Sequence, residues 1–136
     1  MREILFRGKR VDNGEWAEGA LIFADDIFAY ICPDMTDVSY GDNGNRMRIG
    51  CWYQVDPSTV GQYTGLTANG KRIFEGDIFE WGYAGVKEFR YVVAYDADVA
   101  SFVGNRHYGF VSLNGIEIEI IGNIHDHPEL MEVDHE

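Results

Sequence analysis

The sequence is poor in several features that would assign it to a familiar class of protein. It has only two cysteines, Cys32 and Cys51, and neither has a histidine nearby in the sequence, so we expect structural thiols and no metal-bound or reactive pair. No window approaches the ~18 consecutive apolar residues of a membrane span, and the first residues lack the apolar core of a secretory signal. We therefore expect a soluble cytoplasmic protein with reduced cysteines and no membrane partner.

Basic residues are also scarce. The sequence has 11 lysines and arginines but 23 aspartates and glutamates, which gives a net charge of −12. Residues 11–44 contain eight acids and no base, and residues 91–136 contain nine acids and one base. This charge should repel nucleic acid at long range, and the acids suggest one alternative function, a DNA mimic that blocks a DNA-binding protein. A local basic face is the candidate binding site, and its four members are Arg46, Arg48, Lys71 and Arg72.

What the sequence has in abundance is glycine and short β-prone runs. Sixteen glycines separate apolar and aromatic segments that alternate with a period of two or have strong β propensity. Asn13-Gly14 lies between two such segments and predicts a β-hairpin, because both residues tolerate a positive φ. The predicted strands span residues 3–11, 15–23, 27–31, 46–55, 62–64, 77–81, 89–95, 100–103, 108–111 and 116–120.

Two regions depart from this strand pattern. Residues 34–45 are rich in Asp, Gly, Asn and Ser and predict a long loop. At the other end, Asp126 or His127 can cap a short helix over about residues 128–133, with Pro128 at its first position. The fold class is therefore mostly β, as a sandwich or a small barrel.

Two groups of residues suggest chemistry, and we interpret both as structural. His125 and His127 could ligate a metal, which makes a metal-dependent enzyme the rival function, but a helix cap explains the same segment. Glu75-Gly76-Asp77 together with Glu80 could serve acid–base or divalent-ion chemistry, but an Asp that accepts backbone N–H bonds in a turn explains the segment better. We expect no catalytic residue, no metal site and no cofactor.

Aromatic residues next to arginines could stack on single-stranded nucleic acid. Trp52 and Tyr53 follow Arg48, and Tyr91 follows Arg90. Half of the residues in such strands must face a core, so we interpret these aromatics as core residues.

A dense pattern of turn residues runs from Val55 to Ile78, with four glycines, Pro57 and Asn69-Gly70. Together with the opening Arg2–Lys9, the segment Gly14–Gly19 and the ending Ile121–Leu130, it resembles the YopX-like proteins of bacteriophages and prophages. The resemblance spans nearly the whole chain. It implies a small, mostly β protein in the cytoplasm of a bacterial host, and it implies no activity, because the function of the family is unknown.

The sequence thus predicts a hairpin-based sheet over residues 1–57 and a small SH3-like barrel over residues 58–136, interlocked as one folding unit. The predicted function is that of a non-enzymatic phage accessory protein that binds a protein or a nucleic acid, and self-association into a homo-oligomer stays open. We expect the contact surfaces at the 34–45 loop and at exposed edge strands.

Overall fold

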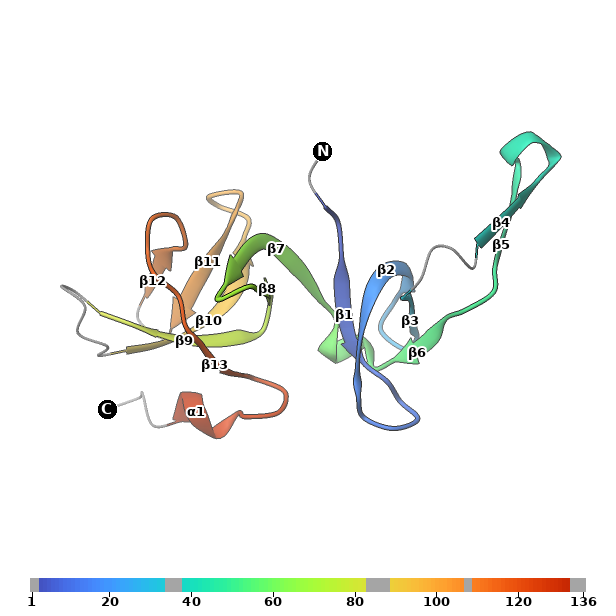
Figure 1. Ribbon diagram of the computed structural model, residues 1–136. Helices are drawn as coiled ribbons and strands as arrows, with labels where there is room; N and C mark the ends of the chain where they lie inside the picture. The colour runs from blue at the N-terminus through green and yellow to red at the C-terminus, as the bar shows by residue number, and fades with distance from the viewer. Residues whose placement is uncertain (1–2, 34–37, 83–88, 107–108, 133–136) are drawn as a thin grey trace. The chain divides into compact units, whose positions relative to one another are not determined.

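The computed structural model describes residues 3–33, 38–82, 89–106 and 109–132. Within these residues the chain forms thirteen β-strands and one short α-helix (Figure 1). The chain divides into two compact units, Met1–Gln62 and Tyr63–Glu136. Among the described residues no helix has the length and apolarity that a membrane crossing requires.

The first unit contains a sheet with the strand order β6-β3-β2-β1, and β1 also pairs with the first two residues of β7. All pairs in this sheet are antiparallel. A small core of Ala17, Ala29, Ile31 and Val55 lies against it. The strands are β1 (Phe6–Lys9), β2 (Trp16–Ala24), β3 (Ala29–Cys32) and β6 (Tyr53–Val55).

The predicted hairpin at Asn13-Gly14 is confirmed. Strand β1 pairs with β2 in the register Lys9↔Trp16, and the N–H of Gly14 donates to the carbonyl of Arg10 at 2.9 Å. Of the two turn residues only Gly14 has a positive φ, of 71°. The turn therefore uses the conformational freedom of the glycine alone.

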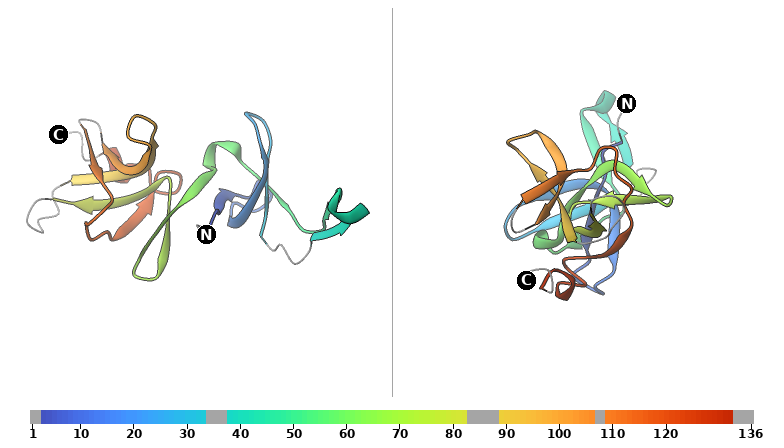
Figure 2. Two further views of the ribbon diagram at one scale, coloured as in Figure 1. Left: turned by 90° about the horizontal axis from the view of Figure 1, so that it is seen from above. Right: turned by 90° about the vertical axis from the view of Figure 1, so that its left-hand side faces the viewer.

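The loop predicted over residues 34–45 is wrong in part. Residues 34–37 lie outside the described part, but β4 (Val38–Gly41) pairs with β5 (Arg46–Ile49) as a separate two-stranded sheet, visible as its own ribbon in both views of Figure 2. The continuous strand predicted over residues 46–55 is split into β5 and β6, which belong to different sheets.

The second unit contains a five-stranded antiparallel sheet with the order β12-β11-β10-β9-β13 and a hairpin of β7 and β8. Its core is built from Ile73, Phe79, Tyr91, Val93 and Leu113. The elements are β7 (Gly61–Ala68), β8 (Lys71–Phe74), β9 (Asp77–Trp81), β10 (Phe89–Asp96), β11 (Ser101–Arg106), β12 (Gly109–Ser112), β13 (Ile120–Asn123) and α1 (Glu129–Glu132).

The mostly β fold and the short C-terminal helix are confirmed, whereas the SH3-like barrel is not. None of the sheets formed by the described residues closes into a barrel. The boundary between units follows Gln62, five residues later than the predicted change at residue 57, and the interlocked folding of the two parts stays a prediction.

The strand predicted over residues 116–120 is wrong, because only Ile120 belongs to a strand. The alternation that suggested it is nevertheless real. Ile116, Ile118 and Ile120 pack against the core of the second unit, while Glu117 and Glu119 are exposed. An extended segment can therefore present one face to a core without joining the hydrogen-bonded ladder of a sheet.

Candidate binding surface

The β4–β5 hairpin has one apolar face and one polar face. Its register pairs Val38 with Ile49, Ser39 with Arg48 and Tyr40 with Met47. Because directly opposed residues of an antiparallel pair share a face, the valine, isoleucine, tyrosine and methionine lie on one side and the arginines on the other. Tyr40 is 66% exposed and Met47 57%, so the apolar face is largely uncovered.

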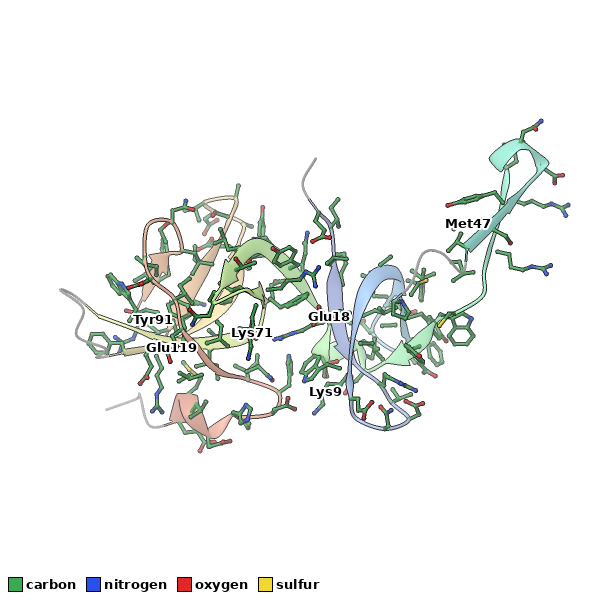
Figure 3. All side chains as sticks on the ribbon, in the orientation of Figure 1. Lys9, Glu18, Met47, Lys71, Tyr91 and Glu119 are labelled. Carbon is green, nitrogen blue, oxygen red and sulfur yellow. The ribbon has the colours of Figure 1, made fainter. Side chains whose placement is uncertain are left out.

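A cavity of about 390 Å³ lies between this apolar face and the sheet of the same unit. Met47 and Ile49 line it from the hairpin, and Ile22, Tyr30 and Trp52 complete its walls. Figure 3 shows Met47 on the hairpin. The cavity is thus walled by apolar and aromatic side chains, which is the composition of pockets that anchor a ligand or a partner side chain.

Aromatic rings extend this apolar lining. Trp52 meets Tyr30 edge to face with ring centroids 5.3 Å apart, and Phe28 stacks on the same tyrosine at 6.5 Å. Trp52 and Phe28 are both exposed. We use the name apolar surface for the set Ile22, Phe28, Tyr30, Met47, Ile49 and Trp52.

The predicted basic face is divided between the two units. Arg46 and Arg48 lie on β5 in the first unit, where they line a second hollow of about 450 Å³ with Ser39, Tyr40, Gly41 and Met47. Lys71 and Arg72 lie on β8 in the second unit, and both are exposed. Each pair is therefore present on its own strand, and a single face that unites all four stays a prediction.

The two arginines of β5 differ in their surroundings. The Nε of Arg46 forms an exposed ion pair with Asp42 at 2.8 Å. The side chain of Arg48 forms neither a hydrogen bond nor an ion pair with any of the described residues.

The turn at Glu75-Gly76-Asp77 has the structural role that the sequence predicted. Asp77 is only 4% exposed, and its Oδ2 accepts the backbone N–H of Phe74 at 2.8 Å. Gly76 supplies a φ of 94°. The carboxylate organises the turn between β8 and β9, and no catalytic role is needed to explain it.

A second turn contains His125 and His127. The Oδ1 of Asn123 accepts the backbone N–H groups of His125 and Asp126, and the Nδ1 of His127 accepts the N–H of Asn123 at 3.3 Å. No group of three His, Cys, Asp or Glu side chains that could hold a metal occurs in the part of the chain that the structure describes. His107 and His135 lie outside that part.

Asn123 is the functional residue of this turn that the sequence analysis missed. The backbone N–H of His127 also donates to the carbonyl of Asn123 at 2.8 Å, and a cap on the helix from Asp126 or His127 stays a prediction. The apolar surface was missed as well. Its only sequence signal is the apolar–polar alternation of residues 38–41 and 46–49, which the surrounding turn residues obscure.

One protein family matches nearly the whole chain. The family described as YopX protein matches residues 6–132, which include both units and the hairpin. No curated protein is significantly similar to the chain. The matched range covers far more than half of the sequence, and the chain therefore belongs to the YopX protein family.

Proposed function

We propose that the protein is a non-enzymatic binding module that contacts another protein through the apolar surface of its first unit. The observation that carries the proposal is the apolar cavity of about 390 Å³ beside the exposed hairpin. The resemblance to phage and prophage proteins supports an accessory role in the cytoplasm of a bacterial host.

The composition of the surface favours a protein partner. Binding energy at protein interfaces is concentrated in a few aromatic and apolar residues that fill desolvated pockets, and Trp52 and Met47 are such residues at the edge of a pocket. Arg46 and Arg48 lie on the opposite face of the hairpin and supply a charged rim. Lys71 and Arg72 remain proposed contacts on the second unit.

A capture experiment with matched variants tests the proposal. The tagged chain is co-expressed with an untagged copy and isolated from the lysate of a bacterial host. The bound proteins are then identified by mass spectrometry, with and without nuclease treatment of the lysate. The double variant M47A/W52A should lose the bound protein. The control F110A removes an equally exposed aromatic side chain from β12 in the second unit and should retain it.

The outcomes separate the alternatives. A partner that both variants retain would refute the role of the apolar surface. A partner lost on nuclease treatment would indicate nucleic-acid binding instead. Basic DNA-binding proteins captured at low salt and released at high salt would favour the DNA-mimic alternative.

A further inference from the structure

A β-bulge in β2 directs an additional aromatic side chain to the exposed side of the first sheet. The register pairs Leu21 with Ile31 and then Phe23 with Tyr30, so Ile22 is an extra residue in β2. Leu21 packs against the core of the first unit, and regular alternation would return Phe23 to that same side. Phe23 instead shares a face with Tyr30 and is 50% exposed, while Ile22 lines the cavity. A bulge that redirects side chains in this way is typical of a functional site.

The turn between β2 and β3 places an acid at the edge of the apolar surface. The Oδ1 of Asp25 accepts the backbone N–H groups of Ile27 at 2.8 Å and Phe28 at 2.7 Å, so this carboxylate holds the turn in shape. Phe28 belongs to the apolar surface and stacks on Tyr30, which lines the cavity. The neighbouring Asp26 is exposed, and its side chain forms no hydrogen bond or ion pair with any residue that the structure describes.

The charge beside the apolar surface is therefore negative. Residues 11–44, which include this turn and strand β4, contain eight acids and no base. Arg46 and Arg48 lie on the polar face of the hairpin, opposite the apolar face that borders the cavity. Because complementary charge favours an interface and like charge opposes it, a cationic partner fits this surface and an anionic partner does not.

From this combination we propose that the apolar surface binds a segment of another protein that carries an apolar anchor and, beside it, a lysine or arginine. The anchor enters the cavity lined by Met47 and Trp52, and the cation pairs with Asp26. Burial of the anchor supplies most of the binding free energy, because an exposed ion pair contributes little. The charge selects among apolar segments. This inference rests on the proposed function and names the chemistry of the partner.

Selection from a random peptide library tests the proposal. The immobilised full chain selects peptides, and those that also bind M47A/W52A are removed. The remaining peptides should combine aromatic or aliphatic residues with lysine or arginine and contain few acids. Their affinities, measured with synthetic labelled peptides by fluorescence anisotropy, should fall by about tenfold or more in M47A/W52A. Circular dichroism verifies that each variant folds.

Two matched variants isolate the charge. D26N should weaken binding of a selected peptide by about two- to fivefold at low salt, and the difference should shrink as salt is added. The control D98N removes an exposed acid from a turn of the second unit and should leave the affinity unchanged. When the cation of the peptide is replaced by glutamine, D26N should have no further effect, because the pair is already broken.

Three results would overturn the inference. They are a library that yields no peptide dependent on the apolar surface, selected peptides that lack basic residues, and a D26N affinity equal to that of D98N. If the capture experiment still identifies a protein that M47A/W52A loses, the proposed function stands and only the chemistry inferred for its partner fails. A captured protein that M47A/W52A retains would refute both.

Discussion

Removing the carboxylate of Asp77 should destabilise the second unit strongly. In D77A the backbone N–H of Phe74 loses its acceptor, 2.8 Å away, in a place where water cannot replace it, since Asp77 is 4% exposed and Phe74 2%. A buried donor left without an acceptor costs about 1–3 kcal/mol, and a hydrogen bond to a charged group lies at the upper end of that range. We expect D77A to lower the free energy of unfolding by about 2–3 kcal/mol.

Two further variants separate the effect of the lost hydrogen bond from the effect of the lost charge and from the effect of removing any carboxylate. D77N keeps an oxygen that can accept the N–H of Phe74, so it should lose only about 1 kcal/mol. D98A removes a carboxylate from an exposed turn, where the observed hydrogen bond comes from the backbone N–H of Asp98 and not from its side chain. Its free energy of unfolding should stay within about 0.5 kcal/mol of that of the unchanged chain.

Urea unfolding followed by far-ultraviolet circular dichroism measures these differences. For a small unit, 2–3 kcal/mol corresponds to a midpoint lowered by about 1–2 M urea. Amide hydrogen exchange adds a local measurement, because the Phe74 N–H should lose protection in D77A and keep most of it in D77N. A midpoint for D77A equal to that of D98A, with the Phe74 amide still protected, would refute the structural role of the carboxylate.

Three other variants test the backbone and the turns. G19A should lose about 1–3 kcal/mol in urea unfolding, because its new methyl group would overlap a backbone carbonyl of β3, whereas G41A, with 3.9 Å of clearance, should be nearly neutral. G70A should lose about 1 kcal/mol in the same assay, because its φ of 79° suits glycine. Hydrogen bonds from the backbone N–H groups of Phe28 and Ile27 hold the pKa of Asp25 below its ordinary value. The stability from this carboxylate is present at neutral pH and is lost as the pH falls through the lowered pKa, so thermal melts of D25N and of the unchanged chain should converge at acid pH.

Local turn chemistry was the most predictable part of this fold. Asn13-Gly14, Asp56-Pro57 and Gly76-Asp77 form the turns that their residue types favour, and the side chain of Asp56 accepts the N–H of Ser58 at 3.0 Å. Each of these turns depends on residues within a few positions of each other. The Asn69-Gly70 turn matches the preference of Asn-Gly pairs for positive φ at both positions, because both residues adopt a positive φ.

Strand ladders were less predictable, because alternation reports which side chains face a core and not which backbones pair. Ile116, Ile118 and Ile120 alternate as a strand would, and they pack as predicted, but only Ile120 joins a ladder. In β4 and β5 the opposite happened, since turn residues around the hairpin concealed a real ladder. The pairing of two backbones leaves no signal of its own in the sequence of either segment.

The candidate surface shows why exposure is hardest to predict. Tyr91 and Trp52 both follow an arginine in an aromatic run, and core packing was expected for both; Tyr91 is 4% exposed, whereas Trp52 is 54% exposed. Tyr91 lies on β10 and belongs to the core of the second unit, where its ring stacks on Phe79. Trp52 lies between β5 and β6, where the chain passes from one sheet to another, and its contact with Tyr30 leaves more than half of it exposed. An aromatic side chain at such a crossing is available for binding because the chain's own sheets end there, and this depends on the topology of the whole unit.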